Sequence, residues 1–534
     1  MMKRAIYALL LIVALSKFGL AQNDARELWL VRSQTLTSDI LKDAADLSLT
    51  QRAVLWVKLA KRWWREDPKR ASVWITNAIE VVEQVPNKEK PEERSERVET
   101  ARVLLTIVTP LDQKLAKRLL TVLTSDKSTD DERSGAANAL IDAAATIVEE
   151  DPKRAAELAA MGLRTGRPSN NLHQLLIPLR ERDPKLADSL FIQALALVKQ
   201  DPRSRLANSL MFVAFPAQRG LDANTPVPPD PLRVELLQFY LSLITDSANQ
   251  NSNCGTVSWL SPLFTEFERL LPKQWPIVRQ AINQCQSTTS GPTQRYLEEA
   301  TRTQPLDTVE SFLKAAADAK DTEVRMDYEY RAASLAAERK DYERALKLLD
   351  DMPKEQRGES WDSWRWVWAS DGAVEHYKHG RFREMNLMLD AVPTDLQPLA
   401  KAAFIQWLPE GSVSETAPII QVLNDAIKGL PRSSIPESDK HNWYFSLLRS
   451  TVKYQPADAN TVLKDAIASL NKAKDEQPLD SNDYLLSIGP SLIEMDEFVV
   501  KDALASVTLV QTRAQLRLAL LDATLQRMSI HRLR

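Results

Sequence analysis

The sequence predicts an all-α protein, built as a right-handed solenoid of stacked helix pairs. Glycine is scarce, with 13 residues in 534, far below the average of about 7%, although strands, hairpins and phosphate loops all depend on it. A helix-start phrase followed by an apolar stripe recurs along the chain, at intervals of roughly 30 to 45 residues, the period of helix–turn–helix solenoids. A chain of this length is also too long to fold around one compact core, which favours a solenoid or several domains.

The helix-start phrase is clearest at Asp151, which Pro152 follows. Aspartate is a preferred N-cap, and proline suits the first helical position because its missing N–H would have no intrahelical partner there. Apolar or small residues follow at the i, i+3, i+4 spacing of a helix that faces a core. The phrase recurs at Asp67 and Asp183, and each copy predicts one amphipathic helix.

The predicted helices fill most of the chain in order. In the first part they cover 49–66, 67–84, 97–108 and 134–150, and others begin at Asp112, Asp151, Asp183 and Asp201. Four prolines lie within residues 225–231, and because proline-rich segments act as semi-rigid spacers we expect a boundary there.

The repeat returns after Pro305, with apolar stripes that begin near Ala345, Met385, Ile419 and Ala459. The section between the proline-rich segment and this return has less helical periodicity. The expected organisation is therefore a signal peptide over 1–21, an N-terminal arm over 22–224, an irregular middle section over 225–304 and a C-terminal arm over 305–534.

The second helix of each expected pair resembles the second helix of a tetratricopeptide repeat. In that family a small residue is followed four positions later by an apolar one and seven positions later by another small one. The sets that carry this pattern are Ala71/Ile75/Ala78, Ala155/Ala159/Gly162 and Ala187/Phe191/Ala194, and residues 342–349 form the closest single copy. The first helices lack the family's Trp, Gly and Tyr at fixed offsets. The resemblance implies a superhelix with a concave surface that binds peptides or partner helices.

The N-terminus has the features of a secretory signal peptide. Lys3 and Arg4 precede an apolar stretch over 5–15, and small residues at 19 and 21 mark a cleavage site after Ala21. The apolar stretch is too short to span a bilayer of about 30 Å as a helix. We expect export to a bacterial periplasm or the exterior, with no membrane span in the mature chain.

The charge balance argues against nucleic acid as a partner. The formal net charge is -3, with 69 basic and 72 acidic residues, and both signs are interspersed rather than gathered into a basic stripe. Since Lys3, Arg4 and Lys17 are lost with the signal peptide, the mature chain is more acidic still.

A tryptophan-rich stretch provides the candidate partner-binding residues, Trp361, Trp364 and Trp368, which share one helical face. Tryptophan offers a large, rigid contact area with one hydrogen-bond donor, so this stripe could hold a peptide or stack on a sugar. The alternative, which the bulk of these residues favours, is that they fill the core between paired helices, because aromatic residues dominate core energetics.

Cys254 and Cys285 are the two cysteines of the chain. In an oxidising compartment they could close one disulfide between the ends of neighbouring helices. The alternative is two buried thiols.

No catalytic, cofactor or metal site is predicted. The chain has no Gly-x-Ser-x-Gly elbow, no glycine-rich phosphate loop and no dinucleotide fingerprint. His376 and His379 stand three residues apart but lack a third ligand, and histidines near a helix end before Gly380 explain the pair.

The sequence therefore predicts a non-catalytic scaffold or adaptor that binds a peptide or partner helix on a concave surface. The alternatives are an α/α-toroid enzyme that acts on polysaccharide through paired carboxylates and a structural spacer without a partner. The partner's identity and the oligomeric state do not follow from the sequence.

Overall fold

The structure, a computed structural model, is all-helical: the residues that it describes form helices and turns and no strand. The described residues are 26–84, 91–124, 130–165, 171–201, 206–216, 224–245, 253–288, 297, 306–319, 321–352, 359–409, 415–473, 485 and 487–533. The predicted signal peptide and its cleavage site after Ala21 lie outside them.

Contacts divide the chain into two compact units. The C-terminal unit combines Met1–Leu55 with Ala333–Arg534, and the central unit is Trp56–Ala332. The divisions fall inside α2 (Leu49–Trp63) and α17 (Thr322–Glu338), so the chain passes between the units twice. This grouping by contacts differs from the arms expected from the sequence, since the first described helix belongs with the last ones.

The central unit is a succession of short and medium helices. They are α3 (Pro68–Gln84), α4 (Pro91–Val108), α5 (Gln113–Leu123), α6 (Asp130–Ile147), α7 (Pro152–Thr165), α8 (Leu172–Arg182), α9 (Pro184–Gln200), α10 (Leu206–Ala214), α11 (Asp230–Thr245), α12 (Asn253–Trp259), η3 (Ser261–Leu263), α13 (Phe264–Leu270), α14 (Trp275–Thr288) and α16 (Val309–Asp318). The proline-rich segment 225–231 lies within this unit, and α11 after it packs against α9.

The helix-start phrase acts as the sequence predicts. Asp67 and Asp151 each accept a hydrogen bond from the backbone N–H three residues later, at 3.0 Å. The Asp183 carboxylate accepts from the N–H groups of Lys185 and Leu186, at 3.1 Å. Each cap satisfies N–H groups that lack an intrahelical partner, which fixes where α3, α7 and α9 begin.

The C-terminal unit holds the helix over residues 26–45 and the last helices of the chain. These are α18 (Tyr342–Asp351), α19 (Glu359–Lys378), α20 (Phe382–Asp390), α21 (Gln397–Trp407), α22 (Thr416–Gly429), η5 (Leu430–Arg432), α23 (Glu437–Tyr454), α24 (Ala459–Ala473), α26 (Gly489–Ile493), α27 (Glu497–Ala505) and α28 (Val510–Leu533).

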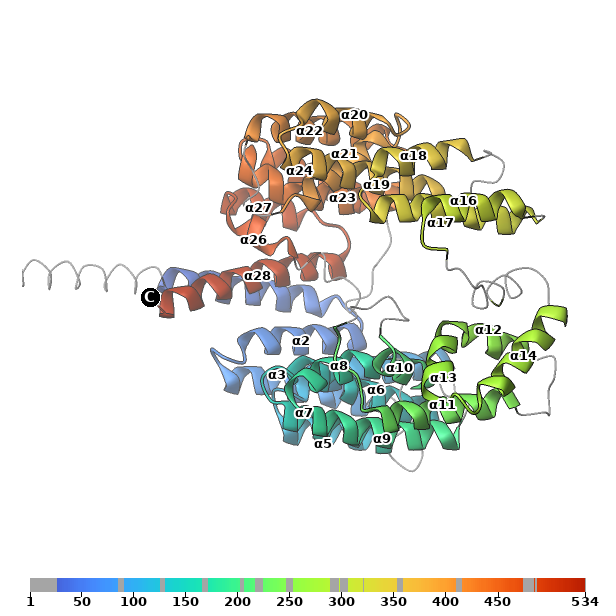
Figure 1. Cartoon of the computed structure of the whole chain (residues 1–534). Coiled ribbons are helices and arrows are strands. Elements are labelled where there is room, and N and C mark those ends of the chain that lie inside the picture. Colours follow the sequence, from blue (N-terminus) through green and yellow to red (C-terminus); the bar gives the residue numbers. More distant parts are fainter. Residues whose placement is uncertain are drawn as a thin grey trace, which may run out of the picture. The chain divides into compact units, whose positions relative to one another are not determined.

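The helices of the C-terminal unit pack in two layers (Figure 1). Each helix from α18 to α24 contacts the next, and α19, α21, α23, α26 and α28 also contact one another in turn. We call this series the first layer; α18, α20, α22, α24 and α27 make the second. Gly372 permits close packing, because a Cβ there would lie 2.5 Å from Met388 Cε and 3.0 Å from Tyr342 Cβ.

The helix over residues 26–45 packs against α28, beside which it runs in Figure 1. The Asp43 carboxylate, 5% exposed, pairs with Arg513 at 2.9 Å and with Arg517 through its other oxygen. Gln51 Nε2 donates to Gln511 Oε1 at 2.8 Å. These contacts join the beginning of the described chain to its end within one unit.

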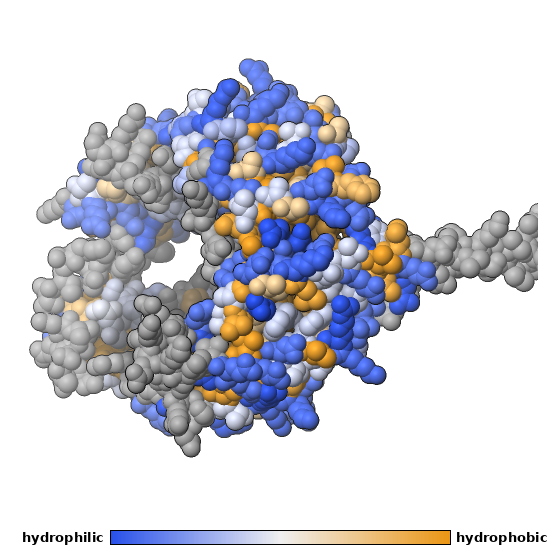
Figure 2. Space-filling view, turned by 180° about the vertical axis from the view of Figure 1, so that it is seen from behind, coloured by the Kyte–Doolittle hydropathy of each residue, from blue (hydrophilic) through white to orange (hydrophobic). Residues whose placement is uncertain are grey.

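The face of the molecule in Figure 2 is mainly hydrophilic, with apolar residues in small patches. Within the described ranges, no helix combines the length and the apolar character that crossing a bilayer requires.

Candidate functional site

The tryptophans singled out by the sequence lie on α19, where they have different surroundings. The side chain of Trp361 is outside the described residues. The rings of Trp364 and Trp368 stand 5.9 Å apart between centroids, as expected one turn apart on one face. Trp364 is 39% exposed, whereas Trp368 is 4% exposed and belongs to the core. Of the described side chains of this stripe, only Trp364 therefore presents a large surface to a partner.

Three other tryptophans come together from successive helices of the first layer. Trp366 on α19 stacks on Trp407 at the end of α21, with centroids 6.1 Å apart and planes inclined by 26°. Its ring also meets Trp443 of α23 edge to face, at 5.5 Å. We call this row of three indoles the tryptophan ladder. Sequence analysis missed it, because ring contacts across helices depend on their stacking.

The ladder is partly accessible. Trp407 is 36% exposed, and Trp366 and Trp443 are half-buried. Half-exposed tryptophans are fixed by packing on one side and offer an aromatic surface on the other, as binding anchors do. The ladder thus combines a rigid base with an open edge.

A pocket of about 270 Å³ is lined by residues of the helices that carry Trp407 and Trp443. It lies between the end of α21, the second half of α23 and residues 487–488. Trp407 stands in sequence between two of its lining residues, and Trp443 precedes Ser446 of the lining by one helical turn. The lining residues are Ile405, Gln406, Leu408, Pro409, Phe445, Ser446, Arg449, Ser450, Lys453, Tyr454, Ser487 and Ile488.

The pocket has an apolar base and a polar rim. Ile405, Phe445 and Ile488 are buried and form its base. Arg449 and Lys453, one turn apart on α23, are exposed and are the charged residues of its described lining.

His441, one turn before Phe445, does not add to this charge. Its ring is 2% exposed and meets the Phe445 ring edge to face, at 6.4 Å. Burial lowers the pKa of His441 below its usual value, against the opposing effect of Asp439, so the imidazole is neutral at pH 7.

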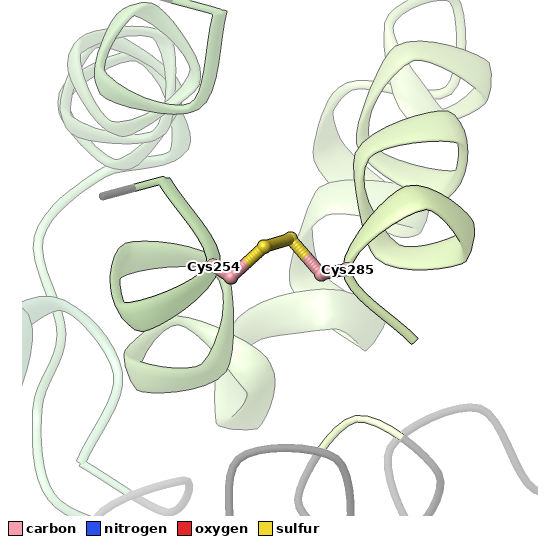
Figure 3. Close-up of a disulfide and its surroundings, with 2 residues drawn as sticks. All are labelled: Cys254 and Cys285. Carbon is pink, nitrogen blue, oxygen red and sulfur yellow. A yellow bond between two sulfur atoms is a disulfide. The ribbon is translucent and has the colours of Figure 1, made fainter. Parts of the chain in front are cut away.

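The two cysteines are joined in the structure. Cys254 of α12 and Cys285 of α14 form a disulfide with their Cα atoms 5.3 Å apart (Figure 3). Both are buried, so the bond is a structural link inside the central unit.

His376 lies in the last turn of α19, and His379 follows the end of this helix. His379 Nε2 lies 3.2 Å from the Glu375 carboxylate, which also pairs with Lys340. Across the described ranges, no group of three or more His, Cys, Asp or Glu side chains is arranged to hold a metal ion.

Comparison with known proteins adds no relative: the chain matches no family model, no curated protein and no solved structure.

Proposed function

We propose that the chain is an exported, tetratricopeptide-like solenoid that acts as a non-catalytic scaffold, and that it binds a peptide segment of a partner protein across α19, α21 and α23. The observation that carries this proposal is the tryptophan ladder, in which aromatic side chains from three helices of the first layer contact one another. Clustered tryptophans at the centre of a packed surface are typical of binding hot spots.

The layering of the helices supports a solenoid. Contacts between alternate helices, as in α19, α21 and α23, are those of stacked helix pairs, in which each repeat buries its apolar face against its neighbours. Such stacking presents the exposed sides of successive helices as one extended surface, on which an extended peptide can lie.

The same pocket disfavours the polysaccharide-cleaving alternative at this position. Glycosidases of the common type use two carboxylates on either side of the scissile bond. Among the described residues that line the pocket, the charged ones are instead Arg449 and Lys453. Export is supported by the N-terminal pattern of the sequence and by the Cys254–Cys285 disulfide, since disulfides persist mainly in oxidising compartments.

Peptide selection with a ladder variant tests the proposal. Peptides are selected from a random library with chain 22–534, and their affinities for Trp407→Ala are then measured. Truncation of a hot-spot residue costs about 2 kcal/mol of binding free energy, which weakens binding by about 30-fold. Phe498→Ala is the matched control, because Phe498 is 78% exposed on α27, away from the ladder helices, and it should bind like the wild type.

Circular dichroism and the unfolding midpoint establish that Trp407→Ala is folded, and Trp407→Phe provides a milder variant that keeps an aromatic ring. Unchanged affinity in folded Trp407→Ala, or selection of no peptide at all, would contradict the proposal. In the second case, glycan-binding and hydrolysis screens test the alternative function.

A further inference from the structure

We infer that the pocket on α21 and α23, the helices that carry Trp407 and Trp443, binds a carboxylate of the peptide partner. The inference rests on the proposed function, since the ladder supplies the contact for the rest of the peptide. Its basis is the set of groups that α21, α23 and residues 487–488 place around one small pocket.

The first component is charge. Arg449 and Lys453 stand at i and i+4 on α23 and both line the pocket. A guanidinium binds a carboxylate through two parallel N–H donors, and an ammonium adds a mobile point charge. Lys453 Nζ lies 4.9 Å from the ring centroid of Tyr454, which also lines the pocket. This cation–π contact favours a position of the ammonium group near the pocket.

The second component is a set of hydroxyl donors. Ser446 and Ser450 lie one turn apart on α23, and Tyr454 follows one turn later; all three line the pocket. Hydroxyl groups rotate to suit their partners and donate to carboxylate oxygens. A carboxylate that enters the pocket would thus meet cations and neutral donors together.

The remaining lining suits the residue that carries the carboxylate. The last turn of α21 includes Gln406, and the last C=O groups of a helix have no intrahelical partner and can accept hydrogen bonds from peptide N–H groups. The base of Ile405, Phe445 and Ile488 is apolar and suits an aliphatic or aromatic side chain. A nucleic acid would need a longer basic stripe than two cations on one helix.

A carboxylate can come from the C-terminus of a partner or from an Asp or Glu side chain, and three peptide pools separate these sources. The first pool has free C-termini and no acidic side chains, and the second has amidated C-termini and acidic side chains. The third pool has amidated C-termini and no acidic side chains, so it carries no carboxylate. We expect chain 22–534 to bind the first or the second pool at least about tenfold tighter than the third, the effect of a charge-assisted hydrogen bond. Equal binding of all three would overturn the inference.

Lys453→Gln locates the effect. This substitution should weaken binding of the preferred carboxylate pool by about tenfold and leave binding of the neutral, amidated pool unchanged. The control Lys428→Gln, at an exposed lysine of α22 in the second layer, should change the binding of neither pool. Added salt should reduce the preference, because screening weakens exposed charge pairs.

The two proposals fail in different ways. If Trp407→Ala weakens the binding of every pool but Lys453→Gln weakens the binding of none, the proposed binding surface is supported and the carboxylate inference is wrong. If no pool binds the wild type, the proposed peptide-binding function fails as well.

Discussion

Replacement of Asp43 by alanine is expected to destabilise the C-terminal unit by about 3 kcal/mol, the low end of the cost of breaking a buried ion pair. Asp43 is 5% exposed and pairs with both Arg513 and Arg517. Removal of the carboxylate leaves two guanidinium groups, each largely buried, without their shared partner. Urea denaturation followed by tryptophan fluorescence measures the change.

Asp39→Ala is the matched control on the same helix. The Asp39 carboxylate pairs with Lys42, whose side chain is 73% exposed, and such surface pairs contribute about 0 to 1 kcal/mol. Both substitutions replace aspartate in a helix interior, so differences in helix propensity cancel. Equal midpoints for the two variants would show that the helix over 26–45 does not contribute to the C-terminal unit as described.

The double variant Cys254→Ser, Cys285→Ser is expected to lower the stability of the central unit by about 3.7 kcal/mol, the loop-entropy value for the sequence separation of 31 residues. The bond restricts the unfolded chain, and both cysteines are buried. Urea denaturation of oxidised wild type, reduced wild type and the double variant measures this contribution.

Reduction of the wild type should lower the free energy of unfolding by as much as the double substitution does. This comparison distinguishes the effect of the lost disulfide from the effect of the introduced serines. An intact mass of the protein purified from its host then tests export: we expect chain 22–534 with two hydrogens fewer than the dithiol form. A free dithiol, or a mass that retains residues 1–21, would contradict the export proposal.

Local sequence signals predicted individual helices well. The stripe after Asp67 predicted a buried face, and its members are all buried: Ala71, Trp74, Ile75, Ala78, Ile79 and Val82. The stripe after Asp183 is buried in the same way. These predictions succeed because an N-cap and a 3.6-residue period act within one helix.

Contacts between distant segments were not predictable from these signals. Asp43 and Arg513 are 470 residues apart, and no local rule pairs an aspartate near the N-terminus with an arginine of the last helix. Their contacts unite these two segments in one unit.

The tryptophans of α19 illustrate the same limit for the candidate site. Helical spacing correctly placed Trp364 and Trp368 on one face, but burial depends on the neighbouring helix. Next to Trp368, Ser370 Oγ donates to the Ala400 carbonyl of α21 at 2.9 Å, so this turn faces the core. Trp366, outside the predicted stripe, instead reaches Trp407 and Trp443.

Hydrogen exchange of chain 22–534, with and without a saturating selected peptide, tests the central claim most directly. A ligand that binds the native state suppresses local opening of the elements that it covers. We predict slower exchange in α21 and α23, with no change in the central unit. Slower exchange confined to the central unit, or none in α21 and α23 at saturation, would contradict the assignment of the tryptophan ladder as the binding surface.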